Sequence, residues 1–198
     1  MRRRPLGDAG QAFPIYITVV GGLLFLAFAY LAVGQAAANR NGAQTAADAA
    51  VLAAAQDTRK QLADEWTRSV LDPTQWGQIF GGEAAGLAPS CWRASQLAAQ
   101  NDAHVEACSP YGLLAYKVTV RNDKSAGESI VPATASKHSK ASAIAVIEPL
   151  CTFKPLAEDA GDDVLPRLSC KGGNWDLDPK HLTDLPSPED LFDVHLAD

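Results

Sequence analysis

One apolar run near the start of the chain limits, more than any other feature, what the protein can fold into. The run reads FPIYITVVGGLLFLAFAYLAVG and extends from Phe13 to Gly34 without a charged residue. At about 1.5 Å per residue, a helix over this run spans roughly 30 Å, the thickness of the hydrocarbon core of a bilayer. A soluble helix that is apolar on every side would need a larger protein around it. We therefore predict a membrane-spanning helix over residues 13–34.

The charges around this run predict its orientation. Arg2, Arg3 and Arg4 precede it, so the positive-inside rule places residues 1–12 in the cytoplasm and everything after Gly34 outside the cell. A cleavable signal peptide is the alternative, because the alanines at positions 36–38 resemble a cleavage site. The apolar run is longer than the usual core of a signal peptide. This favours a retained, single-pass anchor in the cell membrane.

Charge and cysteine content agree with an exported chain. The formal net charge of −6 argues against nucleic acid as the main partner. All four cysteines follow the apolar run, and they allow three pairings that the sequence cannot distinguish. We expect Cys91–Cys108 and Cys151–Cys170, because each closes a short loop and would restrict the unfolded chain by roughly 3 kcal/mol. The CxxC spacing that favours zinc is absent.

The residues after the run predict a long helix followed by a sheet. Residues 35–72 are rich in alanine and other helix formers, and Asp72-Pro73 ends the helix because a residue before proline avoids the α region. Alternating side chains from Leu114 to Arg121 indicate a half-buried strand. Residues 141–148 read as a second strand, apolar on both faces, which suggests a central position or a covering helix. We predict an α+β fold with a small, antiparallel, disulfide-stabilised sheet in residues 73–152.

The last part of the chain, residues 153–198, is acidic and rich in proline. Within it, Ser187-Pro188-Glu189-Asp190 is typical of a helix start, with serine as the cap and proline in the first position. We therefore expect the final DLFDVHLAD to form a short helix that docks on its own domain or contacts a partner.

Residues that could carry chemistry are scattered. His104, His138, His181 and His195 form no i, i+4 pair, and no GxSxG, P-loop or dinucleotide motif occurs. A Ser–Lys hydrolytic pair could be drawn from Ser136, Ser139 and Lys140, but in a polar hairpin such residues are more often solvated. Oxygen ligands for calcium occur at Asn174, Asp176, Asp178 and Asp184 without EF-hand spacing, and an acidic surface loop explains them equally. We therefore expect no enzyme, no cofactor and no metal.

The N-terminal third of the chain carries two motifs in succession. Gly10-Gln11-Ala12 leads directly into the apolar run, and QTAADAAVLAAA follows it from Gln44 to Ala55. Together they resemble the TadE/TadG-like proteins of bacterial Flp (tight adherence) pilus assembly, over roughly residues 7–60. The cysteines and acidic tail downstream are similar to those of exported actinobacterial proteins.

This resemblance implies a pilin-like arrangement, in which the alanine-rich helix continues the membrane helix and carries a small sheet domain. It implies membrane lipid and other pilin-like or pilus-assembly proteins as partners, with oligomerisation through the N-terminal helix. Alanine allows helices to approach closely. The residues expected to pack are Ala46, Ala47, Ala50, Val51 and Ala54. The alternative is a solvated stalk that only sets a distance from the bilayer.

One position departs from the pilin pattern. Pilins cut by prepilin peptidase are cleaved after a glycine and carry glutamate five residues beyond it, followed by tyrosine. Counted from Gly10, these positions hold Ile15 and Tyr16, so the tyrosine fits and the glutamate is missing. The departure argues against cleavage at Gly10 and against a major pilin. We expect an accessory or minor pilin-like component; a membrane-tethered extracellular binding module is the alternative, and a secreted enzyme is a third reading that we favour least.

Overall fold

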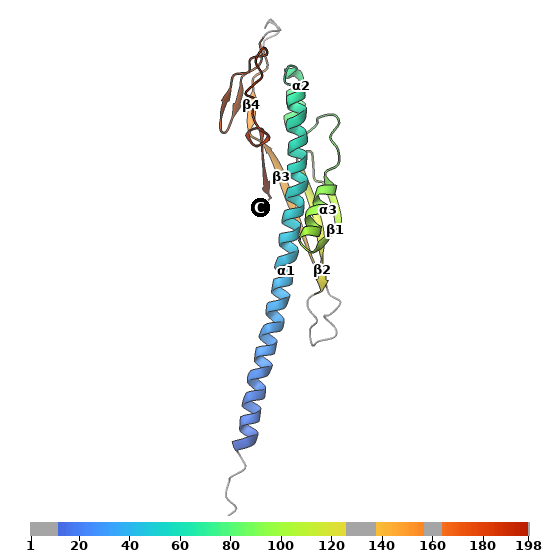
Figure 1. Ribbon diagram of the computed structural model, residues 1–198, viewed down its shortest axis with the longest axis vertical. Helices are drawn as coiled ribbons and strands as arrows, with labels where there is room; N and C mark the ends of the chain where they lie inside the picture. The colour runs from blue at the N-terminus through green and yellow to red at the C-terminus, as the bar shows by residue number, and fades with distance from the viewer. Residues whose placement is uncertain (1–11, 126–137, 157–163, 198) are drawn as a thin grey trace, which may run out of the picture.

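A computed structural model describes residues 12–125, 138–156 and 164–197, arranged around one long helix (Figure 1). The helices are α1 (Ala12–Arg68), α2 (Pro73–Phe80), α3 (Cys91–Gln100) and α4 (Pro188–Leu191). The strands are β1 (Ala103–Pro110), β2 (Ala115–Ser125), β3 (His138–Pro149), β4 (Cys151–Phe153), β5 (Leu168–Cys170), β6 (Gly173–Trp175) and β7 (Phe192–Leu196). All described strand pairs are antiparallel, which confirms the predicted α+β fold.

The apolar run and the alanine-rich segment form a single helix. α1 contains 57 residues, so it is about 85 Å long. Its only proline, Pro14, lies in the first turn, where the missing N–H does not interrupt the hydrogen bonding of the helix. Figure 1 shows that one half of α1 projects alone from the molecule, whereas the other half lies along the rest of the chain.

The larger sheet has the strand order β1-β2-β3-β7 and packs one face on α1. In β2, Val118 and Val120 are fully buried, while Lys117 between β1 and β3 points outward and is exposed. The alternation predicted from Leu114 to Arg121 is therefore present, with one face on the helix and the other open to solvent. β3 lies between β2 and β7, as its two apolar faces predict.

Two disulfides join the pairs of cysteines that were expected. Cys91 at the start of α3 is bonded to Cys108 in β1, and Cys151 in β4 is bonded to Cys170 directly opposite it in β5. The second disulfide holds the small sheet β4-β5-β6 together. The described residues contain no free cysteine.

Two elements between the long helix and β2 were not predicted. Asp72-Pro73 ends the first helix as expected, but it also starts α2, because the Asp72 carboxylate accepts a hydrogen bond from the Thr74 backbone N–H at 3.2 Å. β1 has weak alternation in its sequence because a bulge shifts its register between Val105 and Ala107. The bulge is visible only in the strand pairing, whereas Asp72 and Pro73 are a local signal for the start of a helix.

The predicted C-terminal helix is correct at its start and wrong beyond it. The Asp190 carboxylate accepts a hydrogen bond from the Ser187 backbone N–H at 2.8 Å, as in a capping box, but α4 ends at Leu191. β7 follows and pairs with β3, because that strand offers unpaired backbone groups. Leu191 and Phe192 are fully buried, so this segment docks on its own chain. The boundary drawn from the sequence between residues 73–152 and 153–198 thus separates two segments that are joined in the structure by the pairing of β7 with β3 and by the Cys151–Cys170 disulfide.

The core changes in character along α1. Near the sheet it consists of small side chains, with fully buried alanines on α1, α3 and β3, among them Ala50, Ala98 and Ala145. At the far end it is aromatic: the ring centroids of Trp66 and Trp76 are 5.5 Å apart. Phe80, Phe153 and Phe192 complete that cluster. Small side chains allow the sheet to lie close to α1 in the middle of the molecule.

Candidate functional site

The projecting half of α1 exposes large apolar side chains over its whole circumference. Phe25 is 72% exposed and Tyr30 is 83% exposed, and no described residue outside α1 covers them. The helix is long and apolar enough to cross a membrane, with a mean hydropathy of 2.2 over its most apolar window, and none of that window is buried. A continuous apolar surface of this kind requires an apolar environment such as lipid or another helix.

The folded part begins at Asn39, where side-chain amides fasten α1 to β2. The Asn39 Nδ2 donates to the Ser125 carbonyl oxygen at 3.1 Å, and the Asn122 Nδ2 donates back to the Asn39 carbonyl oxygen at 2.9 Å. Asn122 is buried, and its Oδ1 has no partner among the described residues. Because Asn39 lies about 7.5 Å along the helix from Gly34, the end of β2 lies close to the end of the apolar run.

The structure places the five expected packing residues inside the molecule. Ala46, Ala47, Ala50, Val51 and Ala54 are all 0% exposed. The half of α1 that contains them packs on β2, β3 and α3 of the same chain. They therefore present no side-chain surface to another molecule. The stalk alternative also fails for these residues, because they are not solvated. The part of α1 before Asn39 exposes its whole circumference and is free for contacts with other helices.

The hydrolytic pair considered from the sequence is not assembled by the described residues. Lys140 forms an ion pair with Glu106, with 2.8 Å between Nζ and Oε2. Its hydrogen bond to this carboxylate, more than any other cause, holds the pKa of Glu106 below its ordinary value. Ser139 is half-buried on the same strand as Lys140, and Ser136 lies outside the described residues, as does Gly10.

Two of the four oxygen ligands considered for calcium, Asp176 and Asp178, have separate partners. Asp176 pairs with Arg167 at 3.1 Å. Asp178 accepts hydrogen bonds from the Lys180 backbone N–H at 2.8 Å and from the His181 ring, and these bonds lower its pKa. Within the described part of the chain, the structure does not bring the aspartates of this segment into one group of ligand atoms.

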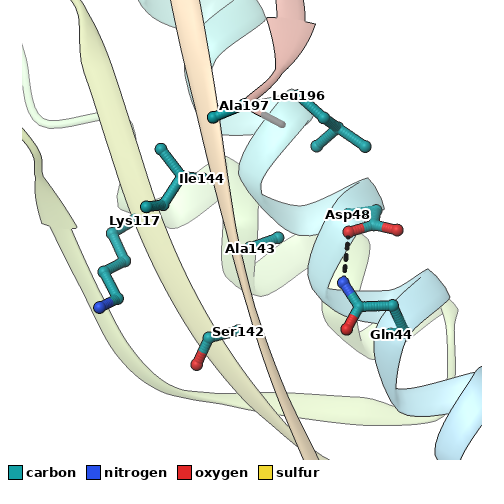
Figure 2. A pocket seen from close by; sticks show the side chains of 8 residues that line it. All are labelled: Gln44, Asp48, Lys117, Ser142, Ala143, Ile144, Leu196 and Ala197. Carbon is teal, nitrogen blue, oxygen red and sulfur yellow. Dashed lines mark hydrogen bonds between the residues drawn. The ribbon is translucent and has the colours of Figure 1, made fainter.

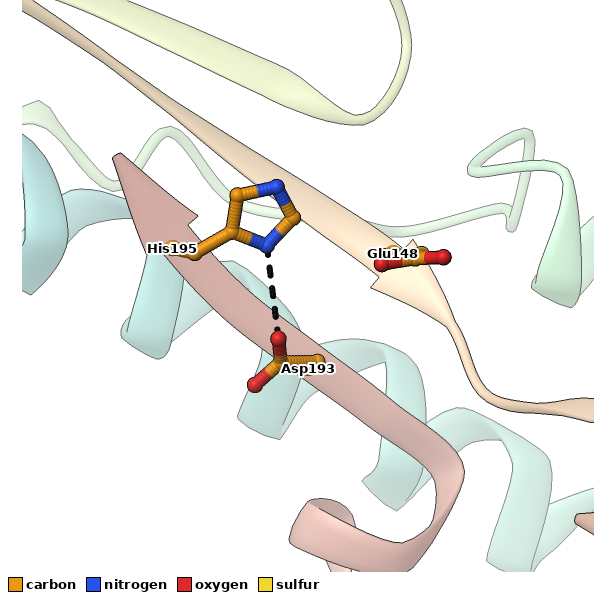
Figure 3. Close-up of side chains that lie close together, drawn as sticks. All are labelled: Glu148, Asp193 and His195. Carbon is orange, nitrogen blue, oxygen red and sulfur yellow. Dashed lines mark hydrogen bonds and ion pairs between the residues drawn. The ribbon is translucent and has the colours of Figure 1, made fainter. Parts of the chain in front are cut away.

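A different group of three ligating side chains lies across β3 and β7 (Figure 3). Single ligand atoms of Glu148, Asp193 and His195 lie within 4.8 Å of one another, and all three side chains are exposed. Glu148 and Asp193 are directly opposite in the ladder, and the His195 Nδ1 is 3.3 Å from the Asp193 carboxylate. No motif in the sequence indicates this group, because only strand pairing brings residue 148 beside residue 193.

Comparison with known proteins identifies the N-terminal part. Residues 10–57 match the model of a family described as putative Flp pilus-assembly TadE/G-like. No curated protein and no solved structure matches the chain. The matched residues are the exposed apolar half of α1 and the start of its buried half, together with Gly10 and Gln11 before the helix. Over this segment the chain is similar to TadE/G-like proteins, in agreement with the resemblance drawn from its motifs, and the match supports a role related to Flp pilus assembly.

Proposed function

We propose that the protein is a membrane-anchored accessory or minor pilin-like component of a Flp/Tad-type pilus or a related secretion system. The observation that carries this proposal is the coincidence of the family match with the exposed apolar half of α1. The matched segment contains the part of the chain whose large apolar side chains are exposed and require an apolar environment. It acts as the anchor and as the surface for helix contacts.

The proposed topology follows from charge and cysteine chemistry. Arg2, Arg3 and Arg4 keep the N-terminus in the cytoplasm, so the part of the chain after Gly34 lies outside the membrane. Both disulfides lie in that part, where an oxidising environment preserves them. The hydrogen bonds at Asn39 hold the sheet next to the membrane surface, so the folded part rises from the bilayer along α1.

The burial pattern restricts where helix contacts with pilus-assembly proteins form. The alanines after residue 43 pack on the chain's own sheet, so intermolecular contacts use the helix before Asn39. In the membrane, helices associate through close packing of small residues. Gly21, Gly22 and the alanines at positions 36–38 are in this exposed part, and an added Cβ at either glycine would meet nothing within 4 Å of the same chain.

Site-specific photocrosslinking in the native host tests this proposal. A photoreactive residue at Leu24, which is 54% exposed, should crosslink to pilin-like or pilus-assembly proteins. The same residue at exposed Trp92, outside the apolar half of α1, is the matched control and should give fewer such products. Retention in the membrane after alkaline carbonate, with an intact N-terminus by mass spectrometry, is expected at the same time.

The alternatives give different results. Crosslinks from Leu24 to lipid alone, without co-purifying pilus-assembly proteins, would favour a membrane-tethered extracellular binding module. A mature N-terminus near Ala37, with the protein in the culture supernatant, would exclude the anchor and with it the proposal.

A further inference from the structure

The N-terminal half of β3, residues 138–143, has an open edge on the side where β7 pairs with the rest of the strand. β7 pairs with β3 only from Ala145 to Pro149, and the ladder ends with a hydrogen bond from the Ala197 N–H to the Ile144 carbonyl oxygen at 2.9 Å. Among the described residues, no strand continues this pairing along positions 138–143 of β3. The opposite edge of the same stretch pairs with β2, with a register shift between Arg121 and Ser125.

The backbone groups of Ser142 and Lys140 point toward this open edge. In a strand, successive residues direct their N–H and C=O groups to opposite sides, and Ile144 directs its carbonyl toward β7. Ser142 and Lys140 have the same parity as Ile144. The Thr119 Oγ1 and Ser142 Oγ lie 2.8 Å apart, as expected for a pair of opposite residues that does not exchange backbone hydrogen bonds. These N–H and C=O groups are therefore available to another strand.

A groove lies along this edge, between the sheet and α1 (Figure 2). Its volume is about 480 Å³. In Figure 2, β3 is seen nearly edge-on, with Ser142 and Ile144 on one side and Gln44 and Asp48 of α1 on the other. Leu196 and Ala197, at the end of β7, close the groove at one end. An added strand would continue the course of β7.

The charges that line the groove indicate the chemistry of its occupant. The Asp48 carboxylate accepts a hydrogen bond only from Gln44, at 2.8 Å, and has no cationic partner among the described residues. Lys117, on the outer face of the sheet, likewise has no anionic partner in the described part of the chain. A strand in this groove would place alternate side chains toward α1 and toward the outer face. A basic residue facing Asp48 and an acidic residue on the outer side complement both charges.

We propose that the open edge of β3 binds an extended segment of another polypeptide as an added antiparallel strand, with a basic side chain toward Asp48 and an acidic one on the outer face. This is strand addition, in which backbone hydrogen bonds supply affinity and alternate side chains supply specificity. The inference goes beyond the proposed role in pilus assembly and does not depend on the identity of the helix partners.

A second copy of this chain fits the edge less well. Two copies joined through their β3 edges by a two-fold axis would pair antiparallel. The apolar ends of their α1 helices would then point in opposite directions, so both could not be anchored in one membrane. The other free edge of the sheet, β1, carries a bulge at the level of the groove, and a bulge weakens pairing with a further strand. The partner is therefore a different polypeptide with an extended segment.

The probe for this proposal is the peptide acetyl-Lys-Glu-Val-Thr-Val-amide, titrated into the full chain in detergent micelles. In the proposed register, its glutamate lies opposite Ser142, its threonine opposite Lys140 and its lysine beside Asp48. The amide NMR signals of Ser142 and Lys140 should shift saturably, with a dissociation constant below about 1 mM. N-methylation of the glutamate should weaken binding about tenfold, because that N–H faces β3; N-methylation of the central valine, whose N–H points away, should change it less than about twofold.

Charge reversal tests the orientation of the added strand. The exchanged peptide acetyl-Glu-Lys-Val-Thr-Val-amide should bind the native chain more weakly, and the double variant Asp48→Lys/Lys117→Glu should reverse this preference. Loss of the shifts, or equal effects of the two N-methyl groups, would overturn the proposal. Concentration-dependent changes of the same amides without peptide would assign the edge to a second copy and would also overturn it.

Discussion

Replacing Ala50 with leucine tests whether small side chains are what allow the sheet to lie on α1. Ala50 is 0% exposed, and its neighbours one turn away on the helix, Ala46 and Ala54, are also fully buried. Leucine adds three carbon atoms at a position with no exposed surface, and overpacking of this kind typically costs about 1–3 kcal/mol. Leucine and alanine are both strong helix formers, so little of the loss would come from helix propensity. We expect the free energy of unfolding to fall by about 2 kcal/mol.

Tryptophan fluorescence measures this effect without interference from the apolar half of α1. All four tryptophans lie at or after residue 66, in the part of the chain beyond the apolar run. A loss of about 2 kcal/mol should lower Tm by roughly 4–8 °C for a folded part of this size. The matched control is Ala37→Leu, because Ala37 is on the same helix but exposed; it should change stability by less than about 0.5 kcal/mol.

The opposite change gives a second check at the same position. Ala50→Gly should also destabilise the folded part, by about 1–2 kcal/mol, because glycine lowers helix propensity and removes a buried methyl group. If the Tm of the Ala50→Leu variant were the same as that of the native chain, the interface between α1 and the sheet would have room for a larger side chain. Alanine at this position would then not be needed for the sheet to approach α1.

Three further predictions concern the disulfide, an ion pair and the amide contacts. Cys151→Ser combined with Cys170→Ser should lower the free energy of unfolding by about 3 kcal/mol, measured by denaturant titration without reductant, so that Cys91–Cys108 stays intact. The pKa of Glu106 is held below its ordinary value of 4.5, so its ion pair stabilises the fold above that pH and the contribution is lost as pH falls through the lowered pKa; an NMR titration of Lys140→Ala should show the pKa rising toward 4.5. Asn122→Ala should cost about 0.5–1.5 kcal/mol and increase hydrogen exchange at the lower end of β2, whereas unchanged exchange there would contradict the role given to this side chain.

The sequence by itself determined the elements whose signals are local. The charge-free run from Phe13 to Gly34 indicates its environment, because a helix apolar on every side is stable only in an apolar surrounding. The alternation in β2 and the capping residues before α4 likewise depend on neighbours in the chain. The pairings of Cys91 with Cys108 and of Cys151 with Cys170 were correctly expected because each loop is short.

The tertiary structure decided what the alanines contact and what the last residues become. The alanines in residues 46–54 favour close packing, but this local pattern is the same whether they contact another molecule or the same chain. In the folded structure they contact the chain's own sheet and α3. Residues 192–196 form a strand because β3 offers an unpaired edge, a condition set by residues about fifty positions earlier. The same edge, left open below β7, exists only in the folded arrangement, since backbone hydrogen-bonding groups are identical at every residue and only pairing reveals which of them remain free.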